Sequence, residues 1–260
     1  MDLGLQGRKA LITGASKGIG EAIARALAAE GCDIALAARS GDRLSSIASE
    51  LAETHGIKVE AIPIDLSDRG SAEILSQRIP NADILINNSG AIPAGRLDEI
   101  DEITWRATWD LKVFGYINLC RSFFKLMAER QNGVIINIIG ASGERPKSNY
   151  ICGAVANSAI MSFTQALGGD SLYRGVRVVG INPGPVSTER LVELMKGSAR
   201  DRFGDQDRWP ELLKPLPEER AATVEEVADL TVFAASSRSS YTSGCILTVD
   251  GGYCNRGSLM

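Results

Sequence analysis

Short apolar runs alternate with helical patterns along the whole chain, and this alternation constrains the fold more than any other feature. The runs that resemble strands lie at residues 10–12, 34–38, 59–64, 84–86, 134–139, 176–181 and 245–249. The helical patterns lie between them, at residues 18–30, 42–55, 68–79, 101–130, 149–173 and 224–235. Continuous apolar strands joined by helices are typical of a parallel sheet that is covered on both faces. Right-handed crossovers then predict an α/β fold with a doubly wound parallel sheet.

The domain organisation follows from the even spread of these elements. No linker-like segment interrupts them, so we expect a single domain over residues 1–260. The segment 187–222 breaks the alternation, because it is rich in charge and contains Pro210, Pro215 and Pro217. We expect this segment to cross the ligand crevice as a substrate lid.

Composition excludes several classes of protein. Hydrophobic residues make up 44% of the chain and charged residues 23%, which is ordinary for a folded domain. The formal net charge of −4 argues against a dedicated nucleic-acid binder. No apolar run approaches the roughly 20 residues of a membrane helix, and the N-terminus lacks a signal-peptide layout. We therefore expect a cytoplasmic chain whose partners include neither nucleic acid nor membrane.

The histidine and cysteine content excludes further chemistry. The chain has 1 histidine, which argues against a serine–histidine hydrolase and against a histidine-ligated metal site. Its 5 cysteines are odd in number and widely spaced, so neither a disulfide framework nor a structural zinc site is expected. No metal is expected in the site.

A glycine-rich turn joins the first expected strand to the first expected helix. It consists of Thr13, Gly14, Ala15, Ser16, Lys17, Gly18, Ile19 and Gly20. Its glycines allow a tight turn and a close approach to a pyrophosphate, which the N-terminus of the helix then holds. The strand before it and the helix after it are the context that a dinucleotide site requires.

The residues after the second expected strand indicate which dinucleotide binds. An acidic residue in this region would grip the ribose 2′-hydroxyl of NAD, but the chain reads Ala-Ala-Arg-Ser at residues 37–40. Arg39 would instead attract a 2′-phosphate through charge-assisted hydrogen bonds, and Lys17 adds a second cation. We therefore expect NADP(H) as the preferred cofactor, with NAD(H) as the alternative.

Several motifs of this chain occur together, in the same order, in one enzyme family. They are Thr13-Gly14 with Gly18-Ile19-Gly20, Asp65-Leu66, Asn87-Asn88-Ser89-Gly90, Tyr150, Asn182-Pro183-Gly184 and Asp250-Gly251-Gly252. Together they resemble the short-chain dehydrogenase/reductase family over nearly the entire chain. The resemblance implies a Rossmann-type domain of about seven strands that forms a homodimer or a homotetramer.

The resemblance also implies which residues meet the cofactor. Asp65 is expected at the adenine, and Asn87 is expected to hold the central strand and the cofactor. The residues expected to line the nicotinamide are Pro183, Gly184, Val186 and Thr188. The expected cofactor residues outside the glycine-rich turn and Arg39 are Asp65, Leu66, Asn88, Ser89, Gly90, Tyr150, Pro183, Gly184, Val186 and Thr188.

The catalytic set departs from the family pattern. By resemblance, Tyr150 exchanges a proton with the substrate oxygen. The family has a lysine four residues later, which binds the ribose and lowers the pKa of the tyrosine, but this chain has Ala154 there. Gly140 stands at the position of the family's serine, and Lys112 stands at the position of its asparagine.

Two explanations of this altered set are open. In the first, the catalytic site has decayed and the protein only binds a dinucleotide. In the second, Lys112 does the work of the lysine missing at position 154, because a lysine stem reaches about 6 Å and Ala154 leaves room for it. Lys147, in the loop before Tyr150, is a weaker candidate for the same role.

The group that replaces the family's serine is also open. Ser142 could donate a hydrogen bond to the substrate oxygen, or it could make a hydrogen bond within a turn. The backbone N–H groups of residues 140–143 are a further candidate for an oxyanion site.

The main hypothesis is an NADP(H)-dependent oxidoreductase that acts on a carbonyl/alcohol pair. Tyr150 is its acid/base, Lys112 is the cation that lowers the pKa of Tyr150, and Ser142 is a candidate donor. The alternative is a dinucleotide-binding protein without hydride transfer. A third possibility is a non-redox lyase or isomerase that uses the pocket of Tyr150.

Bulky side chains indicate the substrate and the assembly. The segment 187–222 offers an apolar lining for an apolar or aromatic substrate, namely Leu191, Leu194, Met195, Phe203 and Trp209.

The two long helices expected at residues 101–130 and 149–173 carry more aromatic residues than one face of a sheet needs, namely Trp109, Phe114, Tyr116, Phe123, Phe124 and Phe163. This excess favours a symmetric homo-oligomer.

Overall fold

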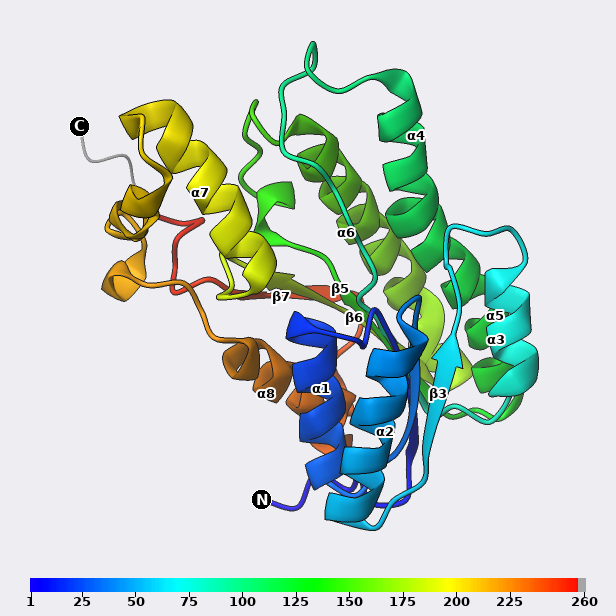
Figure 1. The fold of residues 1–260 in the computed structure, drawn as a ribbon. Coiled ribbons are helices and arrows are strands. Elements are labelled where there is room, and N and C mark those ends of the chain that lie inside the picture. The colour runs from blue at the N-terminus through cyan, green and yellow to red at the C-terminus, as the bar shows by residue number, and fades with distance from the viewer. Residues whose placement is uncertain (257–260) are drawn as a thin grey trace.

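A seven-stranded parallel sheet forms the centre of the computed structural model, which describes residues 1–256 (Figure 1). The strands are β1 (Lys9–Thr13), β2 (Asp33–Ala38), β3 (Val59–Pro63), β4 (Ile84–Asn87), β5 (Gly133–Ile138), β6 (Val176–Pro183) and β7 (Cys245–Val249). Their order in the sheet is β3-β2-β1-β4-β5-β6-β7. The doubly wound Rossmann-type fold expected from the sequence is confirmed.

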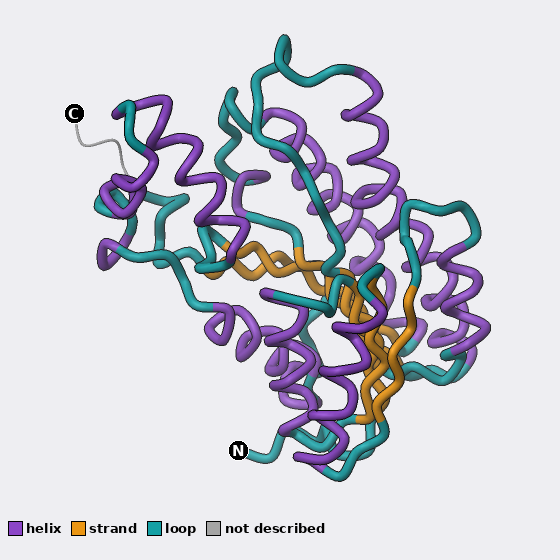
Figure 2. Tube along the Cα trace, in the orientation of Figure 1, coloured by secondary structure: helices purple, strands orange, loops and turns teal. Residues whose placement is uncertain are grey.

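Helices cover both faces of the sheet (Figures 1 and 2). They are α1 (Gly18–Ala29), α2 (Gly41–His55), α3 (Ser71–Arg78), α4 (Glu102–Trp109), α5 (Gly115–Glu129), α6 (Ile151–Ser171), α7 (Glu189–Phe203) and α8 (Val224–Ala235). Helices α1, α2 and α8 pack on one face, whereas α3, α5 and α6 pack on the other.

The sequence of β1 shows why both faces must be covered. Ala10 and Ile12 lie in the core beneath α1, α2 and α8, while Leu11 lies in the core on the opposite side. All three are fully buried. Successive side chains of a strand point to opposite faces, so a continuous apolar run is stable only between two layers of helices.

The long helix expected at residues 101–130 contains a local change of geometry. Between α4 and α5 the chain forms a π-helical turn, η1 (Asp110–Phe114). Such turns are rare and frequently occur at functional sites. Here the turn contains Lys112, one of the predicted catalytic residues.

The segment 187–222 folds into α7 followed by two 3₁₀ segments, η4 (Gln206–Leu213) and η5 (Pro217–Glu219). Its two ends lie side by side. The Ser187 amide donates to the Ala222 carbonyl over 2.8 Å, and the Ala222 amide donates to the Pro185 carbonyl over 2.9 Å. The segment therefore leaves the domain and returns to it at one place.

Candidate active site

The candidate site lies at the carboxyl ends of the parallel strands. The strand order reverses between β1 and β4, and ligands of doubly wound sheets bind in the crevice at such a point. The segments that leave the neighbouring strands here are residues 14–18 after β1, 88–90 after β4, 139–143 after β5 and 184–188 after β6. Each of them carries residues that the sequence predicted for the site.

The glycine-rich loop is held by hydrogen bonds to two neighbouring strands. The Gly14 amide donates to the Ala37 carbonyl over 2.8 Å, and the Asn88 amide donates to the Thr13 hydroxyl over 2.9 Å. A Cβ on Gly20 would lie 2.4 Å from the Gly14 carbonyl oxygen and 2.5 Å from Asn88 Nδ2. Because Gly20 has no side chain, the first turn of α1 can lie close to the loop. The cradle and its N-terminal amide groups fit a pyrophosphate.

The start of α7 lies against the same loop. A Cβ on Gly18 would lie 3.4 Å from Thr188 Cγ2. The ammonium of Lys17 lies 3.6 Å from a carboxylate oxygen of Glu189, and both side chains are largely exposed. The segment 187–222 thus begins beside the expected position of the cofactor phosphates.

Two arginines lie near the end of β2, where a 2′-phosphate is expected. Arg39 is 73% exposed, and its Nη1 lies 4.0 Å from an oxygen of Asp65. Arg43 donates from Nε to the Ser16 carbonyl over 2.9 Å. Arg43 was absent from the sequence prediction because it lies past the positions that conventionally select the cofactor. Arg43 Nη2 also pairs with a carboxylate oxygen of Glu21 over 3.1 Å, so each of the two positive side chains at this edge has an acidic neighbour.

The other predicted cofactor residues lie along the same crevice. Asp65 accepts from the amide and the hydroxyl of Ser67 over 2.9 and 2.7 Å, and these bonds lower its pKa. Leu66 and Ser89 are buried. The Ser89 amide donates to the hydroxyl of Thr13 over 3.2 Å, which fixes the loop that continues to Gly90.

The residues predicted to line the nicotinamide form the exit from β6. Pro183 is the last residue of the strand, and the Gly184 amide donates to the Val249 carbonyl over 2.8 Å. Val186 is buried. Thr188 is the N-cap of α7 and accepts a backbone hydrogen bond from its first turn.

Tyr150 lies immediately before α6, with its ring against its own helix. A Cβ on Gly153 would lie 2.2 Å from Tyr150 Cε1, so the ring occupies the space above a glycine. Burial raises the pKa of Tyr150, the positive charge of Arg190 lowers it, and the Cys152 thiol raises it. Arg190 is thus a positive side chain acting on Tyr150 that the sequence analysis did not name, and a role of Lys112 as such a cation stays a prediction.

Lys112 is buried and reaches the end of β5. Its ammonium donates to the Ile139 carbonyl over 2.6 Å. Its Cδ lies 3.1 Å from the position of a Cβ on Gly90, so the stem passes over the loop after β4. Burial, together with the charge of Arg190, lowers the pKa of Lys112 to about 7. The side chain thus forms part of the floor of the site.

The buried ammonium predicts a pH-dependent stability. Between pH 7 and the ordinary lysine pKa of 10.5, the unfolded chain holds a proton on Lys112 that the folded protein has largely released. In this window Lys112 makes the free energy of unfolding rise by about 1.4 kcal/mol per pH unit. Lys112→Met removes this contribution, so its unfolding free energy relative to wild type should fall by that amount per unit between about pH 7.5 and pH 9. Urea unfolding of both proteins measures the difference, and a pH-independent difference would contradict the lowered pKa.

The space beside Gly140, the residue expected at the position of the family's serine, is filled from the neighbouring helix. A Cβ on Gly140 would lie 2.7 Å from Nδ2 of Asn157, which is buried on α6. Asn157 Nδ2 donates to the Ser142 hydroxyl over 2.8 Å, and the Gly140 amide donates to Asn182 Oδ1 over 3.3 Å. Because Ser142 Oγ accepts this bond, its own proton is free for a further acceptor. Asn157 was not predicted, since it lies outside the family motifs quoted for this chain.

Lys147 is directed toward the C-terminal segment. Its ammonium donates to the hydroxyl of Tyr253 over 3.0 Å and lies 5.1 Å from the centre of that ring. The sequence kept Lys147 as a weaker candidate for the cation near Tyr150. In the structure its partner is Tyr253.

The aromatic residues that the sequence predicted for the lid and for the oligomer interface differ in how far they are buried. The ring of Phe203 lies beneath Arg208, whose guanidinium carbon is 4.4 Å from the ring centre. Tyr116 and Phe123 are fully buried in the core of their own chain, so they contribute nothing to an interface. Phe114 remains 50% exposed.

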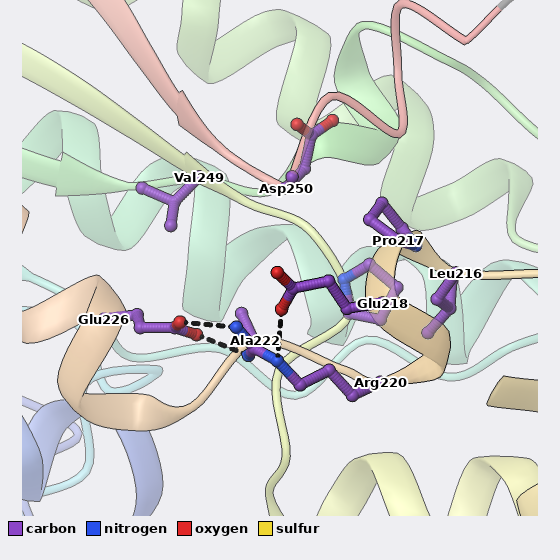
Figure 3. Close-up of a pocket in the computed structure, with 10 residues that line it drawn as sticks. Leu216, Pro217, Glu218, Arg220, Ala222, Glu226, Val249 and Asp250 are labelled. Atoms are coloured by element: carbon purple, nitrogen blue, oxygen red, sulfur yellow. Dashed lines mark hydrogen bonds and ion pairs between the residues drawn. The ribbon is translucent and has the colours of Figure 1, made fainter.

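A separate pocket of about 350 Å³ lies at the base of the segment 187–222 (Figure 3). Arg220 donates to Glu218 over 2.9 Å and to both carboxylate oxygens of Glu226 over 2.8 and 2.9 Å. The bonds from Arg220, together with the bond from the Thr223 amide, lower the pKa of Glu226 to about 2. This pocket stands where the two ends of the segment meet, and its lining in the described chain contains no predicted catalytic residue.

No cluster of three or more histidine, cysteine, aspartate or glutamate side chains within residues 1–256 could hold a metal ion. No helix in this range is long and apolar enough to span a membrane.

Comparison with known proteins places this geometry in a family. The profile described as short chain dehydrogenase matches residues 8–198. Galactitol 2-dehydrogenase (L-tagatose-forming) of Cereibacter sphaeroides is 33% identical, with 96% of each chain covered. Nodulation protein G of Rhizobium sp. (strain N33) is 30% identical, with 95% of this chain and 97% of the relative covered.

A solved structure has nearly the same fold. The crystal structure of L-sorbose reductase from Gluconobacter frateurii, in complex with NADPH and L-sorbose, superposes with a TM-score of 0.92. The two chains are 32% identical, and the match covers 99% of this chain and 100% of the other.

Proposed function

Because the chain belongs to the short-chain dehydrogenase family, we propose that it is an NADP(H)-dependent oxidoreductase that interconverts a carbonyl compound and its alcohol. The observation that carries the proposal is the position of Tyr150. It lies beside the loop after β4 at the carboxyl edge of the sheet, in the same crevice as the glycine-rich loop. The reductase with the matching fold was crystallised with NADPH.

The described residues fit the dinucleotide in the following way. The cradle at Gly14 and Gly20 would receive the pyrophosphate, and Arg39 and Arg43 would pair with the 2′-phosphate. Thr188 would close on the nicotinamide end from the start of α7. When bound, NADP(H) supplies or accepts the hydride at the substrate carbon.

The side chains of the protein then handle the substrate oxygen and its proton. Tyr150 donates its phenolic proton to the oxygen during reduction and accepts one during oxidation. Ser142, held by Asn157, donates a second hydrogen bond to the same oxygen. Lys112 replaces the lysine missing at position 154 as a hydrogen-bond donor at the floor of the site.

An apolar or aromatic substrate is part of the proposal. Tyr150 packs against a cluster that includes Ile92, Trp109, Ile139 and Met161. This apolar wall beside the proton donor favours a hydrophobic group on the substrate carbon. We propose that the segment 187–222 closes over it as a lid, with α7 as its moving part.

A symmetric homo-oligomer is also proposed. Exposed apolar side chains remain on the two long helices after the core is formed, namely Ile103 (80%), Phe114 (50%) and Val155 (44%). Covering them in a second copy of the chain would bury apolar surface. Sedimentation should therefore give a mass two or four times that of one chain, and Phe114→Glu should shift it toward the monomer. A wild-type monomer at micromolar concentration would refute this assembly.

One observation favours the alternative, a dinucleotide-binding protein without hydride transfer. Ala154 is buried where the family has its lysine, and burial raises the pKa of Tyr150. A combined experiment separates the two functions. NADPH binding is titrated directly, and NADPH consumption is then followed with ketones, aldehydes and ketoses. Consumption with any of them supports the proposal, whereas tight binding without consumption supports the alternative.

A further inference from the structure

Arg190 extends from the first turn of α7 to the loop that follows β4. Its Nη1 donates to the Gly90 carbonyl over 3.3 Å, and its Nη2 donates to the Ile92 carbonyl. These two bonds join the segment 187–222 to the loop that follows β4. Arg190 therefore connects the proposed lid to the body of the domain.

The loop that Arg190 contacts is also the loop that holds Tyr150. The Gly95 amide donates to the Asn149 carbonyl over 2.8 Å, and Gly95 pairs with Tyr150 as an isolated bridge. The Tyr150 ring packs in the same apolar cluster as Ile92. The Arg190 guanidinium and the backbone of Tyr150 thus both contact one short stretch, residues 90–95.

Among the titratable and charged groups near Tyr150, Arg190 has an effect that the others do not share. Cys152 lies on the helix of Tyr150 and disfavours its ionisation, while the Arg190 charge favours it. Lys112 lies on η1, which contacts α6, but its ammonium is directed to the Ile139 carbonyl. Lys147 is bonded to Tyr253.

The charge of Arg190 differs in two respects from other cations discussed for this site. Within residues 1–256, none of the ion pairs involves Arg190. A guanidinium also keeps its proton at every pH at which an enzyme works. Lys112, whose pKa is lowered to about 7, loses its charge in the range where a tyrosine must ionise.

We propose that Arg190 is a positioning residue that supplies the positive charge beside Tyr150 and fastens α7 to the loop after β4. This inference deepens the proposed function, because the charge has a catalytic purpose only if Tyr150 exchanges a proton with a substrate. In the family pattern the charge comes from the tyrosine's own helix. Here it would come from α7, so the segment 187–222 would also supply the second member of the acid/base pair.

The test is the ionisation of Tyr150 in the whole protein, measured without cofactor or substrate. The ultraviolet absorbance of tyrosinate is titrated in each protein and in its Tyr150→Phe counterpart, and the difference isolates Tyr150. Arg190→Gln should raise the pH at which Tyr150 ionises by about one pH unit or more. Arg190→Lys should keep the midpoint closer to wild type, since it retains a cation.

Arg202→Gln is the matched control, because it removes the same charge from the exposed end of α7. It should leave the titration of Tyr150 unchanged. Arg190→Met is a second neutral variant, and circular dichroism establishes that each variant is folded. An identical Tyr150 midpoint in wild type and in a folded neutral variant overturns the inference, and so does an equal change in Arg202→Gln.

This titration separates the inference from the proposed function. Because it requires no turnover, an inactive wild-type protein would refute the oxidoreductase proposal while the effect of Arg190 on Tyr150 could still be observed. Conversely, an active enzyme in which Tyr150 titrates independently of Arg190 would refute the inference alone.

Discussion

Tyr150→Phe is expected to lower kcat/KM for carbonyl reduction by about 100- to 10,000-fold, which is the usual contribution of a positioned proton donor. The substitution removes one oxygen atom and keeps the ring that packs above Gly153. The fold and the cradle for the dinucleotide should therefore be unaffected. Steady-state kinetics with a substrate from the carbonyl panel measures the loss.

NADPH affinity is the control for this prediction, and it should change little in Tyr150→Phe. Lys112→Met should also lower activity, and the double variant should be little worse than the more damaged single one, because both residues serve one proton transfer. Full activity in Tyr150→Phe would remove the phenol from the mechanism. Full activity in Lys112→Met would remove Lys112 alone.

Arg39→Asp is expected to reverse the cofactor preference. A charge-assisted hydrogen bond contributes roughly 1.5–3 kcal/mol, so wild type should bind NADPH at least about tenfold more tightly than NADH. An aspartate at this position would repel the 2′-phosphate and accept from the 2′-hydroxyl, so NADH should become the tighter ligand. Fluorescence titration of both cofactors gives the four dissociation constants.

The charge-matched control for this prediction is Arg121→Asp, on the exposed side of α5. Arg121→Asp changes the net charge by the same amount as Arg39→Asp. Because α5 packs on β4, β5 and β6, away from β2, the cofactor preference should stay at the wild-type value. Equal affinity of wild type for the two cofactors would contradict the assignment of Arg39. Arg43→Ala is also expected to weaken NADPH binding, as Arg39→Asp does.

The fold could be predicted because its cause is local in the sequence. Apolar runs such as 34–38 need helices on both sides, and the spacing of those helices fixes the parallel sheet. The expected helix 68–79 begins only at Ser71, since the preceding Gly70 has a left-handed φ of +85°. The π-helical turn at Lys112 was not predicted, because residues 101–130 were expected to form one uninterrupted helix.

The glycine-rich loop could be predicted for the same reason, since Gly20 and Gly14 contact each other within one strand–turn–helix unit. Arg190 and Asn157 could not. Arg190 reaches the site because α7 folds back across the crevice, about 100 residues along the chain from the Gly90 carbonyl that it contacts. Asn157 fills the space that Gly140 leaves by having no side chain. This contact joins α6 to the loop after β5, and neither sequence segment shows it alone.

The central claim, hydride transfer from NADPH to a carbonyl carbon whose oxygen takes its proton from Tyr150, is tested most directly with NADPH that carries two deuterium atoms at the reactive nicotinamide carbon. The enzyme is incubated with this cofactor and a carbonyl compound, and the product is analysed by mass spectrometry. We predict an alcohol that carries one deuterium on the former carbonyl carbon, formed by wild type and nearly absent with Tyr150→Phe. Tight NADPH binding with no deuterated alcohol from any member of the carbonyl panel would contradict the claim and leave a protein that binds the dinucleotide without using it.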